Sequence, residues 1–180
     1  MVFFDAFKRD KGPAVRDLIW MSQAAKQNGC LKLLEQYPDA IIIAWFSATH
    51  DLYTQFLNEH GKGLEIRMAR NISSIMVENK IVILLEHYPL LAKEKELIGS
   101  WNAQEIIAIN ALDEPLFQYF GGMRVADLMK AMNIAEDEFI EHILIHKSIE
   151  AAQHKLEKKV MMENSANSAE EWFKRNGEKA

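Results

Sequence analysis

Several features are scarce in this 180-residue chain, and each shortage excludes a class of protein. Cys30 is the one cysteine, so no disulfide can form within the chain, and a reducing cytoplasmic environment is expected. The longest unbroken apolar run covers 40–46, far short of the roughly 20 residues that span a bilayer, so no integral membrane segment is predicted. There is no basic excess either: 21 basic against 26 acidic residues give a net charge of −5. This balance argues against nucleic acid as a partner, because few counterions would be released on binding phosphates.

What the chain does contain is enough apolar sequence for a core, with 49% hydrophobic and 9% aromatic residues. Four short segments, 40–46, 64–68, 81–85 and 105–109, are predicted to be strands. The first and third are apolar throughout, which is typical of strands covered on both faces. Helical patterns separate these segments, and this alternation indicates crossover connections. The predicted fold is therefore α/β, with a small, mainly parallel sheet flanked by helices.

Two further segments of the first half are predicted to be helices. One begins at Pro13 and carries Leu18, Ile19 and Met21 at helical spacing before Gly29 interrupts it. The other covers 51–58, after a predicted strand, and the side chains of Ser47 and Thr49 are expected to cap it.

From residue 113 onward the pattern is helical only. Short helices are predicted after Pro115 and over 125–132, and a long one over 136–162. At 1.5 Å per residue the long helix would measure about 40 Å. The polar tail after it is expected to be frayed or loosely attached. These changes of pattern predict an α/β lobe, a helical extension ending in a long helix, and a polar tail, over 1–112, 113–163 and 164–180.

An apolar seam runs along one face of the long predicted helix, and two interpretations stay open. The seam consists of Ile145, Ile149, Ala152, Leu156 and Val160. It packs on its own domain, or part of it meets another chain. A domain of about 110 residues has a radius of gyration near 13 Å, so one end of a helix of this length is expected to project. The seam is thus the predicted contact for a protein partner or for a second copy.

No cofactor is predicted, because the chain has neither a Walker-type phosphate loop nor the glycine fingerprint of dinucleotide-binding folds. Ser47, Thr49 and His50 follow a predicted strand, at the edge where open α/β sheets bind ligands. Helix capping is the simpler explanation for them, and an anion resting on the helix N-terminus is the alternative.

The sequence predicts neither a metal site nor a reactive thiol. His142 and His146 stand four residues apart, the spacing that places two imidazoles on one helix face. The residues between them lack the glutamate of the H-E-x-x-H motif, so pairing with Glu138 and Glu141 is the simpler interpretation. Cys30 has no base near it in the sequence and is expected to be a buried, unreactive thiol.

The second half of the chain carries a series of short motifs in a distinctive order. They are Leu112-Asp113-Glu114-Pro115-Leu116, Phe120-Gly121-Gly122, Arg124, Ile140-Glu141-His142 and then Lys147 to Glu157. In this order they resemble SecA, the ATP-driven motor of bacterial preprotein translocation. The resemblance implies the end of that family's second motor lobe and the start of its scaffold helix. Over 18–110 the order of strands and helices is similar to a second motor lobe, with weak similarity at the level of residues.

The departures from this family decide what the resemblance implies for function. The first lobe, which supplies the Walker lysine and the acidic motor residues, has no counterpart here. The second lobe's arginine-bearing segment is expected between Ile81 and Glu105, but 86–100 contains no arginine. The groups that stabilise charge on a transferred phosphoryl group are therefore missing.

The resemblance accordingly implies a degenerate, truncated relative with a RecA-like lobe, and no enzyme activity is expected. Its predicted role is that of a protein-binding or adaptor module with a link to preprotein translocation. The alternative is a regulatory domain that binds a nucleotide or another anion without hydrolysis. A third hypothesis, a small enzyme that uses the helix histidines or Cys30, has less support in the sequence.

Overall fold

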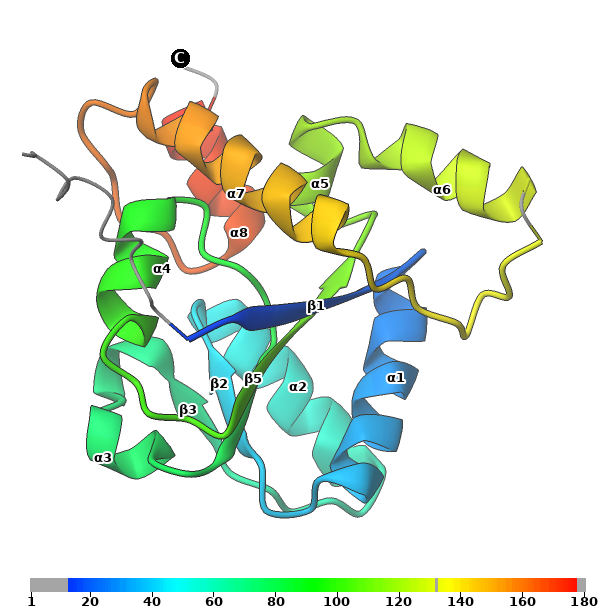
Figure 1. Cartoon of the computed structure of the whole chain (residues 1–180), viewed down its shortest axis with the longest axis vertical. Coiled ribbons are helices and arrows are strands. Elements are labelled where there is room, and N and C mark those ends of the chain that lie inside the picture. The colour runs from blue at the N-terminus through cyan, green and yellow to red at the C-terminus, as the bar shows by residue number, and fades with distance from the viewer. Residues whose placement is uncertain (1–12, 132, 178–180) are drawn as a thin grey trace, which may run out of the picture.

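Within residues 13–131 and 133–177, which are those that the computed structural model describes, five parallel strands form one sheet (Figure 1). The strand order is β1-β5-β4-β2-β3. The strands are β1 (Val15–Trp20), β2 (Ile41–Ala44), β3 (Ile66–Met68), β4 (Ile81–Leu84) and β5 (Glu105–Ala111). The predicted fold class, an α/β sheet flanked by helices with a helical C-terminal part, is confirmed.

Helices cover both faces of this sheet and the ends of its strands (Figure 1). One face packs on α1 (Gln23–Gln36) and α2 (Ser47–Glu59), and the other on α3 (Ser74–Val77) and α4 (Leu91–Ile98). A third apolar cluster lies beyond the carboxyl ends of the strands, and it is closed by α5 (Pro115–Tyr119), α6 (Gly122–Ala131), α7 (Ile143–Glu157) and α8 (Ala169–Trp172).

The central strands form because their residues are apolar on both sides of the backbone. Ile42 and Ile83 face α1 and α2, whereas Ile43 and Val82 face the opposite layer. Each of these four side chains is at most 1% exposed. Three strands, β2, β3 and β4, lie within segments predicted from the sequence, and β5 covers the predicted segment 105–109 and continues to Ala111.

The predicted helix that begins at Pro13 is wrong for its first part, because Val15–Trp20 forms β1. This segment pairs in parallel with β5 along its whole length, from Val15 opposite Ile106 to Trp20 opposite Ala111. A short apolar run does not distinguish a strand from a buried helix, so the partner strand decides. The helix that follows begins after Ser22, whose hydroxyl accepts a hydrogen bond from the Ala25 amide (3.2 Å).

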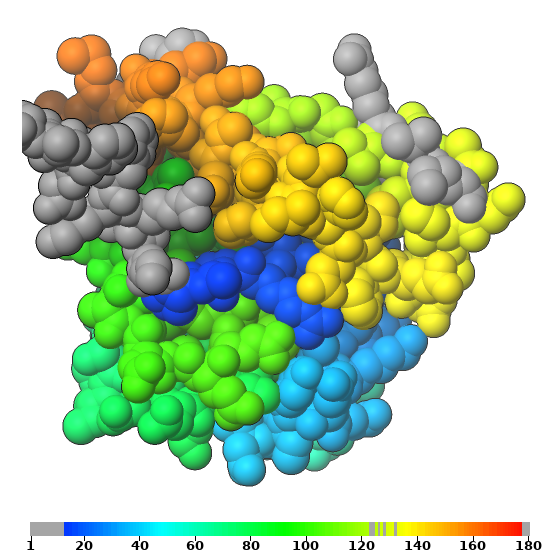
Figure 2. Space-filling view, in the orientation of Figure 1, coloured from blue at the N-terminus to red at the C-terminus, as the bar shows by residue number. Residues whose placement is uncertain are grey.

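The long predicted helix is also shorter than expected: α7 has 15 residues, or about 22 Å. Upstream of it, Ile140 exchanges two backbone hydrogen bonds with Ile19 of β1 (3.1 and 2.9 Å). The segment 136–142 thus runs beside the outer edge of the sheet (Figure 2) and covers backbone groups that an edge strand would expose. His142 caps the helix, with Nδ1 accepting from the Leu144 amide (3.1 Å).

The polar tail is not frayed over its described part. Trp172 in α8 is fully buried, and its Nε1 donates to Glu163 Oε1 (2.7 Å). Asn176 holds the last turn by donating to the carbonyl of Asn164 (3.0 Å). A single tryptophan thus explains why a polar segment packs on the ends of the strands.

The three predicted parts of the chain are in contact in the structure, through the Ile19–Ile140 bridge and through Trp172. The division at residue 112 stays a prediction. Residues 1–12, 132 and 178–180, which belong to the predicted lobe, helix and tail, lie outside the described residues.

Gly29 in the middle of α1 provides a test of this packing. A Cβ at this position would lie 2.2 Å from Cζ2 of the buried Trp20, so the helix and β1 can approach only without a side chain. Gly29→Ala is expected to lower the free energy of unfolding by about 1–3 kcal/mol through overpacking, as measured by urea unfolding. Gly63→Ala is the matched control, because a Cβ there would meet no atom within 4 Å. Equal stability of the two variants would contradict the packing described here.

Candidate functional site

Two buried polar clusters lie next to each other near the carboxyl ends of the strands. One surrounds Glu86, two residues after the end of β4, and the other surrounds His87, the next residue. Glu86 bonds to the start of α2, and His87 bonds to Glu94 of α4, so the two residues serve opposite sides of the sheet. Together they fill the place where ligands bind in open α/β sheets.

The carboxylate of Glu86 occupies the N-terminus of α2. Its Oε1 accepts hydrogen bonds from the amides of Trp45 (3.1 Å) and Phe46 (3.0 Å), and Thr49 Oγ1 donates to Oε2 (2.7 Å). Burial raises the pKa of Glu86 to about 7, against the opposing effect of the Thr49 hydrogen bond. The chain's own carboxylate thus binds the amides just before the first turn of α2, beside the position that an external anion would use.

The three residues considered for an anion site have separate partners. Thr49 contacts Glu86, Ser47 Oγ donates to the Asn167 carbonyl (3.4 Å), and His50 Nδ1 lies 2.8 Å from Asp51. The same Asn167 carbonyl accepts from the amide of Ala48 (2.9 Å). Neither Ser47 nor Thr49 acts as the helix cap, since α2 begins after Phe46 without a side-chain cap.

Lys26 supplies a positive charge at this end of the sheet, and it is already paired. Its ammonium group is 1% exposed and donates to the Leu85 carbonyl and to Glu114. Burial raises the pKa of Glu114, and the charge of Lys26 opposes this effect. The adjoining cavity of about 50 Å³ is far smaller than the roughly 300–1,000 Å³ of ligand pockets. Two carboxyl groups and one ammonium group leave this end unsuited to a phosphate.

The second cluster is built around Asp17 of β1, which lies between two histidines. Asp17 Oδ1 is 2.6 Å from His87 Nε2, and Oδ2 is 2.6 Å from His146 Nδ1. The other ring nitrogen of His87 is 2.9 Å from Glu94 Oε1 on α4. Asn110 of β5 completes the surroundings of Asp17 by donating from Nδ2 (3.4 Å). Carboxylates and imidazoles therefore alternate from α4 through β1 to α7.

The charges in this cluster stabilise one another. Burial lowers the pKa of His87, but the charges of Glu94 and Asp17 outweigh it and hold the pKa well above its usual value. Burial raises the pKa of Asp17, yet the nearby charge of His87 and the hydrogen bond from His146 keep it well below its usual range. That hydrogen bond also raises the pKa of His146, against the effect of burial. These shifts favour the ionised form of Asp17 and the protonated forms of the two imidazoles.

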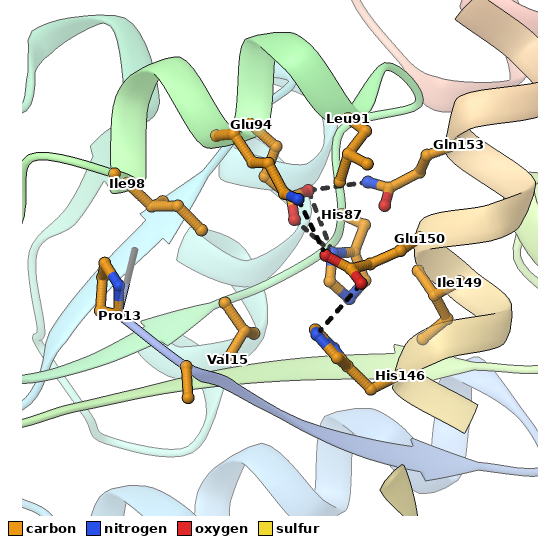
Figure 3. A pocket seen from close by; sticks show the side chains of 13 residues that line it. Pro13, Val15, His87, Leu91, Glu94, Ile98, His146, Ile149, Glu150 and Gln153 are labelled. Carbon is orange, nitrogen blue, oxygen red and sulfur yellow. Dashed lines mark hydrogen bonds and ion pairs between the residues drawn. The ribbon is translucent and has the colours of Figure 1, made fainter. Parts of the chain in front are cut away.

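A cavity of about 350 Å³ lies between α4 and α7, beside this cluster (Figure 3). Lys95 Nζ lies 3.2 Å from Glu150 on its rim, and Gln153 Nε2 donates to the Tyr88 carbonyl (2.7 Å) and to Glu94 (3.1 Å). The His146 side chain, 25% exposed, is the part of the cluster that solvent reaches.

The structure does not bring the two helix histidines together as metal ligands. His142 caps α7 and His146 bonds to Asp17, in place of the predicted pairs with Glu138 and Glu141. Across the described ranges, no three His, Cys, Asp or Glu side chains are placed to hold a metal ion. Cys30 is fully buried, and burial raises its pKa to about 12, so the thiol stays protonated.

The predicted apolar seam is part of the chain's own core in its central positions. Ile149, Ala152 and Leu156 are at most 8% exposed, and Ile149 and Leu156 belong to the cluster beyond the strand ends, whereas Ile145 and Val160 are half-buried. Val160 lies beyond the end of α7. Of the two interpretations of the seam, packing on its own domain describes this arrangement. Contact with another chain requires a different position of α7.

The sequence analysis does not predict the cluster formed by Asp17, His87 and Glu94. Asp17 is 70 residues from His87 and 129 from His146, so only the fold brings them together. One signal was available: Asp17 precedes the apolar run 18–21, where a polar residue next to a buried strand needs a partner.

No protein-family model matches the chain. The protein translocase subunit SecA of Psychrobacter cryohalolentis is 49% identical over 47 residues, and SecA of Pyropia yezoensis and of Acinetobacter baylyi are each 47% identical over 47 residues. The chain contains a SecA-like region.

This SecA-like region is a small part of each protein. It covers 26% of the chain and 5% of the length of these SecA relatives. The resemblance to SecA is therefore supported for about a quarter of the chain. In the described part, no helix combines the length and apolar character needed to cross a membrane.

Glu86→Gln tests the assignment at the α2 N-terminus. A raised pKa means that the folded state binds the proton of Glu86 more tightly than the unfolded state, so folding stability falls as pH rises from about 4.5 to about 7. Glutamine keeps an acceptor for both amides and does not titrate. The wild type is expected to lose on the order of 2–3 kcal/mol relative to the variant over this range in urea unfolding.

The exposed Glu35→Gln is the control and is expected to follow the wild type. Parallel pH profiles for the wild type and Glu86→Gln would show that Glu86 is not buried as described.

Proposed function

We propose that this chain is a non-catalytic SecA-like module that binds protein in connection with preprotein translocation. The SecA-like region supports the link to translocation. The parallel sheet with a helical part beyond its strand ends is consistent with a degenerate second motor lobe, as the sequence resemblance implies.

The observation that carries this proposal is the occupied edge of the sheet. Glu86 fills the N-terminus of α2, and Lys26 is already paired with Glu114. Motor enzymes that transfer phosphoryl groups place cationic groups and Mg²⁺ against the phosphates at such an edge. Here buried carboxyl groups outnumber the positive charge, which supports a role without catalysis. It also weakens the alternative of a regulatory nucleotide or anion site at Ser47, Thr49 and His50.

The partner surface that we propose is the C-terminal helix α7. Ile143 and Leu144 in its first turn are each 62% exposed, although they are large and apolar. Their exposure makes the start of the helix available to a partner while Ile149 and Leu156 remain in the core. A SecA polypeptide is the partner that the similarity favours, and self-association of this chain is the competing outcome.

Nucleotide binding is tested by thermal unfolding with ATP, ADP or GTP and magnesium. A ligand at 100 times its Kd that binds only the folded state would add about 2.7 kcal/mol, a shift of several degrees in Tm. No shift is expected, because Glu86 holds the anion position. A shift that Thr49→Val removes, or ATP hydrolysis that a point substitution in this chain abolishes, would overturn the non-catalytic assignment.

Partner binding is tested with immobilised, purified SecA. Leu144→Asp is expected to weaken binding at least about tenfold by placing a charge in the apolar contact. The matched control is Ile75→Asp, at an apolar residue that is 77% exposed on α3, and it is expected to bind as the wild type does. Light scattering of the chain alone measures self-association. No binding to SecA, or equal weakening by both substitutions, would contradict α7 as the surface for SecA.

A further inference from the structure

We propose that the contact between Asp17 of β1 and His146 of α7 is a proton-controlled latch. It holds α7 on the sheet, and its opening adds the apolar seam to the exposed first turn of α7 as a surface for SecA. The latch itself is inferred from the contacts of α7. That its opening promotes the binding of a partner rests on the proposed function.

The attachment of α7 combines an apolar face with a few polar contacts. Ile149 and Leu156 pack in the cluster beyond the strand ends, and Ala152 between them is buried. Among the polar contacts, Gln153 donates to the Tyr88 carbonyl and to Glu94, and Glu150 pairs with Lys95. His146–Asp17 is the contact that joins the first half of α7 to the sheet. Weakening of the His146–Asp17 contact therefore loosens the N-terminal half of α7, which begins with the exposed residues Ile143 and Leu144.

Charged groups on β1, on α7 itself, on the loop after β4 and on α4 surround His146. Asp17 of β1 lies 2.6 Å from Nδ1, and Glu150 of α7 lies 3.8 Å from Nε2. His87, on the other side of Asp17, opposes the positive charge of His146. On α4, Glu94 is bonded to His87 and Lys95 to Glu150 (Figure 3). Two carboxylates thus contact the His146 ring directly, and each of them has a second cationic partner.

Loss of the His146 proton weakens the attraction of the ring for Asp17 and Glu150. Neutral imidazole keeps one N–H, so it can donate to Asp17 or towards Glu150 but not to both. Asp17 stays ionised, because His87 remains beside it and the side chains of both residues are 2% exposed. His146 is 25% exposed, so its proton reaches solvent through the cavity. His146 is therefore the residue of the cluster that exchanges its proton most readily with solvent.

The direction of the effect follows from linkage. The docked state of α7 binds the His146 proton more tightly than the open state does, because Asp17 raises the pKa. Docking is strongest below the ordinary histidine pKa of about 6.5 and weakens as pH rises through the raised value. For one proton the opening equilibrium increases by at most about tenfold per pH unit.

The test is amide hydrogen exchange of the full chain at about pH 6.5 and about pH 8.5, corrected for the intrinsic rates. Protection of α7 amides is expected to fall at the higher pH, while that of α1 amides stays constant. In His146→Gln, which is uncharged at both pH values, α7 is expected to be weakly protected throughout. In His146→Arg, which stays charged, protection is expected to persist at the higher pH. His50→Gln is the matched control, since His50 is bonded only to its neighbour Asp51.

Unchanged protection of α7 between the two pH values, or the same pH response in His146→Gln as in the wild type, would overturn the latch. If His146→Gln does not fold, as judged by circular dichroism, the arginine variant decides. A pH response of α7 in that variant equal to the wild type's would also overturn it.

Binding of purified SecA at the same two pH values separates the latch from the proposed function. Tighter SecA binding by the wild type at the higher pH, and by His146→Gln, supports both the latch and the proposed function. A pH-dependent α7 with no SecA binding supports the latch and contradicts the function. Binding that is independent of pH and of His146 contradicts the regulatory role of the latch and leaves the function standing.

Discussion

One buried carboxylate, that of Asp17, joins the sheet to α7 and to the residues that contact α4. Its two oxygens contact His87 after β4 and His146 on α7, and His87 passes the contact on to Glu94 of α4. Burying a carboxylate is costly unless charged partners compensate it, and removing one partner of such a group typically destabilises a fold strongly. Asp17 therefore ties the outer strand, a loop and two helices into one arrangement.

The same end of the sheet supports the proposal that the chain lacks the chemistry of a motor. Parallel strands direct their carboxyl ends and helix N-termini to one edge, which in other α/β proteins receives phosphates. Here Glu86 accepts the amides at the start of α2, and Trp172 closes the neighbouring apolar cluster. The chain's own carboxyl groups thus occupy much of this edge, and the first turn of α7 is the partner surface that we propose.

The sequence predicts the sheet better than the site. Runs such as 81–85 predict buried strands because every residue is apolar, whatever the neighbours are. Val15–Trp20 was mistaken for a helix because its pairing with β5, about 90 residues away, is invisible locally. The helix over 136–162 was too long because Ile140 pairs with β1 instead. The Asp17 cluster depends on all of these tertiary contacts, so a local pattern could not reveal it.

The measurement that tests the account most directly is a backbone amide spectrum of the chain, recorded with and without unlabelled SecA. The account predicts shifts or line broadening in α7 and around Ile140, with Ala48 and Thr49 at the start of α2 unchanged. Changes confined to the start of α2 and the loop after β4 would place the binding site at the edge that Glu86 fills, and would contradict the account.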